Sequence, residues 1–288
     1  MSAAPEISVI VPARDAARTL GPLLDSLAAQ TFPAERFEVV VVDNGSTDGT
    51  AELARARGAM VVDEPQPNRA RARNAGVRAA RGEVFAFTDA DCEADRGWLA
   101  AFWDCRGRAP LIAGEVRVAT AEPPNAVERF ESLWRFGQEH WVRQGWAATA
   151  NLLVERDAFD AVGGFDTAWR HIGEDADFCV RAGRAGFALG WCAEAVVSHV
   201  AEAQLWPMLK RAFFHGYSVN QAWYRLGVGY RAWRRPWRAL AGDEALTQYG
   251  SSRAHFEEAE WKRMLRLARA AYAMRVAGSL LAELQRAR

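Results

Sequence analysis

The chain contains little cysteine, and its cysteines are widely spaced. Only four occur in 288 residues, and no two of them form a C-x-x-C pair: Cys92, Cys105, Cys179 and Cys192. This spacing argues against a zinc cluster and against a small scaffold held together by disulfides. A reducing compartment therefore suits the chain best, and we expect a cytoplasmic location.

The chain also has no net charge and very little lysine. Thirty-six basic residues balance thirty-six acidic ones, and lysine occurs only at Lys210 and Lys262. A balanced chain has no global field that would draw it onto nucleic acid or another acidic surface. We therefore expect no nucleic-acid partner, and any site for a polyanion must be local.

Long apolar runs are absent. No stretch approaches the roughly 20 apolar residues that a membrane-spanning helix needs, and the first residues lack the features of a signal peptide. Half of the residues are nevertheless apolar, which is enough for a sizeable core. We expect a folded α/β protein, either free in the cytoplasm or bound at the inner face of the cell membrane.

Strands and helices alternate through the first ninety residues. Continuous β-branched runs predict strands buried on both faces, and leucines or alanines at helical spacing predict helices between them. The expected strands span 7–11, 37–42, 59–62 and 83–88, and the expected helices span 20–27, 50–57 and 70–80. This order predicts a doubly wound sheet whose ligands bind at the carboxyl ends of its strands.

The pattern changes beyond about residue 110. We expect strands at 111–119 and 195–200, helical structure at 125–146 and 174–185, and mostly helices from 204 onward, with a break near 242–252. The sequence thus predicts a domain of residues 1–202, divided near residue 110, and a helical extension of residues 203–288.

Two acids, Asp89 and Asp91, follow the strand expected at 83–88. At the carboxyl end of a strand, both could lie near one ligand, and their oxygens suit Mg²⁺ or Mn²⁺ bridging a diphosphate. Acids in an exposed turn are common without a metal, but the preceding buried strand favours the metal interpretation.

Two further segments carry groups of chemical interest. Glu174 and Asp175 open an expected helix, where acids often serve only as caps, although a carboxylate there could also act as a general base. His199 lies near the end of the strand expected at 195–200. A lone histidine is more often structural, but neutral imidazole is also a common metal ligand.

Polar residues also follow the second strand and precede the fourth. Asp43 and Asn44 could read a base or ribose edge, and Arg69 or Arg73 could neutralise a phosphate. The alternative for the arginines is a solvated helix face, because arginine is the usual cation in this chain.

Taken together and in order, these segments closely resemble the family-2 inverting glycosyltransferases, which have the GT-A fold. The matching pieces span roughly residues 6–200 and read ISVIVPARDAARTLGPLLDSLAAQTF, EVVVVDNGSTDGT, ARNAGVRAARGEVFAFTDADC, NLLVERDAFDAVGGFD, GEDADFCVRAGRAG and VVSHV. The resemblance implies an α/β protein with a GT-A-like, doubly wound mixed sheet flanked by helices. The helical C-terminal extension would follow it.

The resemblance also implies a metal centre and a catalytic base. Asp91 matches the direct ligand of Mn²⁺ or Mg²⁺, Asp89 matches the acid that contacts the donor ribose or metal-bound water, and His199 matches a further metal ligand. Asp175 matches the catalytic base, with Glu174 beside it in the catalytic pair.

The donor pocket follows from the same resemblance. Asp43 matches the residue that accepts from the nucleobase, Pro12 and Ala13 line the nucleotide pocket, and Arg73 or Arg69 would contact the diphosphate. Asp15 and Asn44 complete the expected donor-binding set. Many members have a Tyr-Asn pair and a Glu where this chain has Arg14, Asp15 and Ala17, so the motif leaves the preferred base open.

The function implied is transfer of a sugar, with inversion, from a nucleotide diphosphate sugar to an acceptor hydroxyl. A UDP-sugar is the favoured donor. The acceptor would be a saccharide, a lipid-linked molecule or a small molecule, as in bacterial glycan, glycolipid or small-metabolite glycosylation.

Aromatic residues mark the expected acceptor side. Trp146 and Trp191, together with Asn151, are candidate acceptor contacts, since ring faces stack on sugars; the alternative is that the tryptophans belong to the core. Farther on, aromatic residues alternate with arginines at 223–238. Such a composition suits peripheral contact with a membrane, although helices packed on the catalytic domain would explain it as well.

Other functions fit the sequence less well. A non-catalytic nucleotide-sugar-binding or scaffold protein could keep the same fold, but it would not need all of the acids together with His199. A nucleotidyltransferase would need a glycine-rich phosphate loop with a lysine, which the first strand-helix junction lacks. Nucleic-acid binding by the Trp/Arg region would leave the acids unexplained.

Overall fold

A computed structural model describes residues 4–134, 136–226 and 257–286. The chain divides into two compact units. The first comprises Met1–Arg117, Gly137–Arg170 and Glu174–Val200, and the second comprises Val118–Phe136, His171–Gly173 and Ala201–Arg288. The division at residue 202 expected from the sequence remains a prediction.

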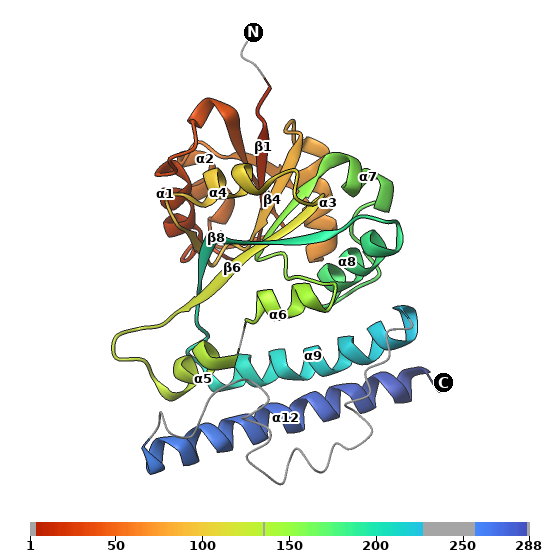
Figure 1. Cartoon of the computed structure of the whole chain (residues 1–288). Helices are drawn as coiled ribbons and strands as arrows, with labels where there is room; N and C mark the ends of the chain where they lie inside the picture. Colours follow the sequence, from red (N-terminus) through yellow and green to blue (C-terminus); the bar gives the residue numbers. More distant parts are fainter. Residues whose placement is uncertain (1–3, 135, 227–256, 287–288) are drawn as a thin grey trace. The chain divides into compact units, whose positions relative to one another are not determined.

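The first unit is built on an eight-stranded sheet with the order β3-β2-β1-β4-β7-β6-β8-β5. Figure 1 labels β1, β4, β6 and β8 of this sheet. Parallel pairing joins β1 (Ile7–Ala13), β2 (Phe37–Asp43), β3 (Met60–Asp63) and β4 (Val84–Thr88). Antiparallel pairing joins β7 (Asn151–Glu155) to β4 and to β6 (Leu111–Ala119), and β5 (Cys92–Ala94) to β8 (Leu189–Val200). The predicted mixed α/β sheet is confirmed.

Helices connect the strands of this sheet. The first unit contains α1 (Leu20–Ala28), α2 (Thr50–Ala56), α3 (Arg69–Ala79), α4 (Trp98–Cys105), α6 (Gln138–Arg143), α7 (Arg156–Val162) and α8 (Glu174–Arg184). The helical stretch expected at 125–146 forms two helices, α5 (Ala126–Trp134) and α6. The first of these belongs to the second unit. Gly137 lies just before α6, with a backbone that is not helical.

Small residues on α3 allow this helix to approach the sheet closely. Ala72 and Ala75 are buried in the main core cluster beside Ile10 and Val42. A Cβ atom added at Gly76 would lie only 2.6 Å from Cγ2 of Ile10 and 3.0 Å from Cγ2 of Val42. The glycine therefore allows α3 to lie close to strands β1 and β2.

The second unit consists of α5 and two long helices, α9 (Leu205–Leu226) and α12 (Glu258–Arg286). The long helices lie side by side (Figure 1). A Cβ atom at Gly216 would lie 1.9 Å from the carbonyl oxygen of Arg275, and one at Gly278 would lie 2.0 Å from that of Phe213. Only glycine permits such close contact between the two backbones.

Part of the C-terminal region for which the sequence makes predictions lies outside the described residues. The break expected near 242–252 and most of the Trp/Arg region at 223–238 lie outside the described residues. Within the part that the structure describes, no helix combines the length and apolar character needed to cross a membrane.

One pair of cysteines is linked. Cys105, at the end of α4, forms a disulfide with Cys192 on β8, whereas Cys92 and Cys179 are free and buried. The pair is separated by 87 residues, and spacing alone does not reveal such connectivity. Disulfides are uncommon in reducing compartments, so this pair weighs against the reducing environment expected from the sequence.

We predict that Gly76→Ala lowers the free energy of unfolding, because the new methyl group overpacks the core, an effect of about 1–3 kcal/mol. Gly183→Ala is the matched control. Gly183 is an exposed glycine of α8 with nothing within 4 Å of an added Cβ, so alanine there should stabilise the protein by up to about 1 kcal/mol. Urea unfolding measures both, and equal effects would contradict the packing described.

Candidate active site

The candidate site lies at the carboxyl ends of the parallel strands. Ala13 ends β1 and pairs in register with Asp43, the last residue of β2. Asp89 directly follows the last residue of β4. Because β1, β2 and β4 are parallel, these residues share one edge of the sheet. Pro12 and Ala13, expected to line the nucleotide pocket, lie at the same edge.

Asp43 and Asn44 differ in what their side chains do. Asp43 is half-buried, and its Oδ1 accepts the backbone N–H of Ser46 at 3.0 Å. Asn44 is buried; its amide donates to the carbonyls of Glu64 and Gln66 and accepts the N–H of Asn68. These bonds anchor the 64–68 loop and argue against a direct donor contact by Asn44.

Asp15 also has a structural task. Its Oδ1 accepts from the backbone N–H of Thr47 at 2.8 Å, and its own N–H donates to Oγ of Ser46 at 3.0 Å. The residue has a φ of +48°, which aspartate tolerates better than most residues. Asp15 thereby ties the loop after β1 to the loop after β2, which explains its place without a donor contact.

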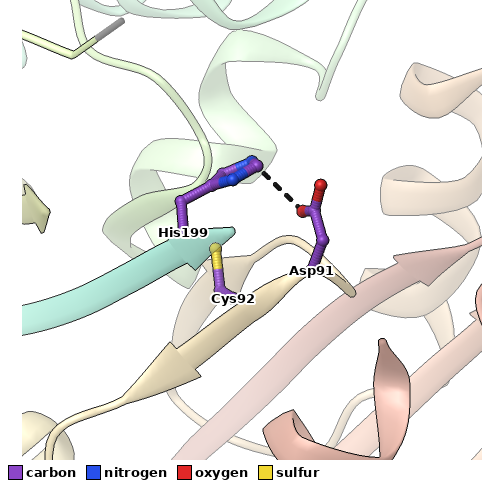
Figure 2. A group of neighbouring side chains, drawn as sticks. All are labelled: Asp91, Cys92 and His199. Carbon is purple, nitrogen blue, oxygen red and sulfur yellow. Dashed lines mark ion pairs between the residues drawn. The ribbon is translucent and has the colours of Figure 1, made fainter. Parts of the chain in front are cut away.

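Asp91 and His199 lie together as the metal prediction requires (Figure 2). Nε2 of His199 is 3.1 Å from Oδ1 of Asp91, although the two residues are far apart in the sequence. The pairing of β5 with β8 brings them together, because Cys92 is the register partner of His199.

The donor atoms of this pair suit a hard divalent cation. Nδ1 of His199 lies 2.9 Å from the carbonyl oxygen of Val200, and a carbonyl can only accept, so Nδ1 carries the proton. Nε2 faces the carboxylate of Asp91, and either a proton on Nε2, which makes the ring cationic, or a bound metal cation can lie between the two atoms. Two ligands at right angles around Mg²⁺ are about 3 Å apart, given bonds of about 2.1 Å, which fits the observed separation.

Cys92 is a third neighbour that the sequence did not single out. Its sulfur lies within 4.8 Å of the ligand atoms of Asp91 and His199. Burial, reinforced by the charges of Asp89 and Asp91, raises the pKa of the Cys92 thiol well above its usual range. A protonated thiol is a poor ligand for hard cations, so the oxygen and nitrogen atoms are the better candidates.

Arg73 joins two of the predicted site acids. Its guanidinium donates to Oε1 of Glu174 at 2.7 Å and to Oδ1 of Asp89 at 3.0 Å. Burial alone would raise the pKa of Asp89, but the charges of Arg73, Arg69 and His199 outweigh it, and the pKa is lowered. Arg73 is 2% exposed, so its position argues against the predicted contact with a diphosphate.

Arg69 is the better placed of the two predicted arginines. It is exposed, it is the first residue of α3, and its charge acts on Asp89. The side chain of Asn68 caps this helix by accepting the N–H of Arg71 at 2.9 Å. A helix N-terminus with an exposed arginine is suited to an anion.

Asp175 lies in the first turn of α8, directly after Glu174. It is half-buried, and its Oδ1 accepts the N–H of Ala176 at 2.8 Å. Burial, together with the charge of Glu174, raises the pKa of Asp175 to about 7, against the opposing charge of Arg73. A carboxylate with a pKa near neutrality suits a general base.

Glu174 differs from its neighbour. Its side chain is 5% exposed and is paired with Arg73. An acceptor could not reach a carboxylate in this position, and so the geometry argues against the direct catalytic role that we expected for Glu174.

The predicted acceptor residues are largely structural. Asn151 is fully buried, its Oδ1 accepts from Nε1 of Trp98, and its amide donates to the carbonyls of Glu115 and Ala195. These bonds argue against an acceptor contact by Asn151. Trp146 and Trp191 are partly buried against the main core, as the alternative interpretation anticipated.

Trp146 has a partner that the sequence did not identify. Its ring stacks on that of Trp141 on α6, with centroids 4.4 Å apart. Both rings are half-buried, so the pair combines core packing with some accessible aromatic surface. The spacing of five residues gave no signal for this stacking.

The sequence is similar to those of known glycosyltransferases. The chain matches glycosyl transferase family 2 over residues 8–140 and glycosyl transferase family group 2 over residues 123–282. It is 30% identical over 238 residues to the glycosyltransferase AglE of Haloferax volcanii, with 77% of this chain and 75% of that protein covered. The chain belongs to glycosyltransferase family 2.

A second relative of this glycosyltransferase is the pre-mycofactocin glycosyltransferase of Mycobacterium tuberculosis. The two are 30% identical over 228 residues, which cover 74% of this chain. The chain spans only about half of that relative, since 47% of its length is covered.

Solved structures support the fold of the glycosyltransferase. A mannosyltransferase from Pyrobaculum calidifontis, in complex with GDP-Man and Mn²⁺, has a TM-score of 0.67 at 21% identity, covering 99% of this chain and 88% of that one. TarS from S. aureus, in complex with UDP-GlcNAc, has a TM-score of 0.56 at 18% identity, covering 98% and 92%. These likenesses confirm the GT-A-like fold.

We predict that Mn²⁺ with UDP or GDP raises the melting temperature of the wild type, because a ligand that binds only the folded state stabilises it. Asp91→Asn and His199→Gln should lose most of this shift. Asp160→Asn is the control, since Asp160 is an exposed acid of α7, which follows the end of β7 that pairs with the first residue of β4. Full metal-dependent shifts in both site variants would place the metal elsewhere.

Proposed function

We propose that this glycosyltransferase moves a sugar, with inversion, from a nucleotide diphosphate sugar to an acceptor hydroxyl. One observation carries the proposal most directly: the guanidinium of Arg73 contacts both Asp89 and Glu174. The acid that follows β4 and the first turn of α8 are therefore neighbours. A donor held by the first and a base carried by the second would meet in one place.

The donor side would use residues at the carboxyl edge of the sheet. Asp43 would accept from the nucleobase beside Pro12 and Ala13, and Arg69 would contact the diphosphate at the start of α3. Asp91 and His199, with Asp89 nearby, would hold Mn²⁺ or Mg²⁺. The Mn²⁺ bound by the Pyrobaculum mannosyltransferase supports a divalent cation here.

When bound, the cation would supply stabilisation of the negative charge on the departing diphosphate. Arg69 would add a second positive charge at the same oxygens. Asp175 would take the proton of the acceptor hydroxyl while that oxygen forms its bond to the anomeric carbon. The bond from the anomeric carbon to the diphosphate oxygen breaks on the opposite face, so an α-linked donor would give a β-linked product.

The donor base is the least constrained part of the proposal. UDP-GlcNAc is bound by TarS and GDP-Man by the Pyrobaculum enzyme, so the relatives support both bases. We favour a UDP-sugar, and we place the acceptor among saccharides, lipid-linked molecules and small metabolites. Contact with a membrane remains a hypothesis about residues 223–238, which lie almost wholly outside the described ranges.

Release of nucleoside diphosphate from UDP-, GDP- and dTDP-sugars tests the function. The assay is run with and without Mn²⁺ or Mg²⁺, and with water or simple saccharides as acceptors. Metal-dependent turnover of one donor supports the proposal and identifies the base. Donor binding that never leads to turnover with any acceptor would favour the non-catalytic alternative, a nucleotide-sugar-binding scaffold.

We predict that Asp175→Asn lowers kcat by about 10²–10⁴-fold, the usual range for loss of a general base. Donor binding, measured by calorimetry with the nucleoside diphosphate and Mn²⁺, should be retained. Asp157→Asn, at the first turn of α7, is a control that should keep both properties. Near-normal turnover in Asp175→Asn would require another base.

The pH dependence follows from the raised pKa of Asp175, which lies at about 7. Turnover should rise as pH increases through 7, because only the ionised carboxylate accepts a proton. Stability should change in the opposite direction, since the folded protein holds this proton more tightly than the unfolded chain does. Thermal unfolding at pH 6 and pH 8 should therefore show Asp175→Asn gaining stability over the wild type at the higher pH; an equal difference at both values would contradict the raised pKa.

A further inference from the structure

Arg73 contacts two acids that differ in exposure, and one of them is far away in the sequence. Glu174, 101 residues away in the chain, is 5% exposed, whereas Asp89 is 32% exposed. The two bonds use different nitrogens of the guanidinium, Nη1 for Glu174 and Nη2 for Asp89. One rigid, planar group thus sets the separation of the two carboxylates.

The surroundings leave this group no freedom. Arg73 is 2% exposed, and its guanidinium lies 5.8 Å from the centre of the Phe165 ring. A buried charge persists only where it is paired, and removal of its partner is strongly unfavourable. If Arg73 turned toward solvent, Glu174 would be left as a buried, unpaired charge; if Glu174 turned away, the buried Arg73 would keep only Asp89.

We propose that Arg73 is a positioning residue for catalysis, which holds the first turn of α8 through Glu174 and aligns Asp175 with the donor-side acid Asp89. This inference rests on the proposed role of Asp175 as base. It assigns to Arg73 and Glu174 a task in the reaction without contact with the substrate.

Electrostatics supports the same assignment. The charge of Glu174 acts to raise the pKa of Asp175, and the charge of Arg73 acts to lower it. Removal of either partner should therefore move the pH at which turnover begins, and the two removals should move it in opposite directions. These shifts would report that both charges lie close to Asp175, and the change in kcat would report the positioning.

The test compares kcat, donor KM and the pH profile of turnover in four variants. Glu174→Gln keeps an acceptor for Arg73 but removes the negative charge, and Arg73→Met removes the positive one. Arg73→Met with Glu174→Met replaces the ion pair with apolar groups, which avoids the unpaired, buried charge of Glu174 that Arg73→Met alone leaves. Asp177→Asn is the matched control, because Asp177 is a buried acid of the same helical turn that pairs along α8, with Arg181.

We expect Glu174→Gln to shift the rise in turnover to lower pH and Arg73→Met to shift it to higher pH. Glu174→Gln should lower kcat with little change in donor KM, since the acids that face the donor are untouched. The double variant should remain folded with kcat reduced on the order of 10²-fold, the scale of a small misplacement of catalytic groups. Asp177→Asn should leave the pH profile unchanged.

Two results would overturn the inference, and they differ. If the double variant has wild-type kcat, or if Glu174→Gln has wild-type kcat and an unshifted profile, the ion pair is structural only, while Asp175 keeps its proposed role. If Asp175→Asn, measured alongside, retains turnover, the proposed base is wrong and the positioning role falls with it.

Discussion

The candidate site depends on one constraint, the burial of the Arg73 guanidinium between Asp89 and Glu174. A buried cation must have partners, and here the partners come from the loop after β4 and from the start of α8. Gly76 on the same helix allows α3 to lie close to β1 and β2. The close packing of α3 thus places the cation at the edge where the parallel strands end.

The same edge explains why residues of distant segments meet. Parallel pairing aligns the ends of β1, β2 and β4, and the pairing of β5 with β8 adds His199 beside Asp91. Side-chain hydrogen bonds hold the loops at this edge: Asn44 bonds to the backbone of the 64–68 loop, and Asp15 joins the loop after β1 to the loop after β2. Several polar side chains at this edge therefore hold the loops in place.

The sequence was sufficient to predict the alternating strands and helices, because β-branched runs and helical spacing are local signals. Motif order also singled out Asp89, Asp91, Asp175 and His199 as candidates, and their roles stay predictions. It kept Glu174 in the catalytic pair beside Asp175, and it left Arg73 and Arg69 as alternatives, because the sequence does not show which side chains are buried and paired. Nor could it show that Asn151 is saturated by buried partners or that Cys105 and Cys192 pair, since both depend on contacts between distant segments.

Pulsed electron paramagnetic resonance of Mn²⁺ bound with UDP or GDP would test most directly whether Asp91 and His199 form one metal and diphosphate site. The structure predicts coupling of Mn²⁺ to phosphorus of the diphosphate and to one imidazole nitrogen, with the nitrogen coupling lost in His199→Gln. Phosphorus coupling without any nitrogen coupling, or a nitrogen coupling that survives in His199→Gln, would contradict it.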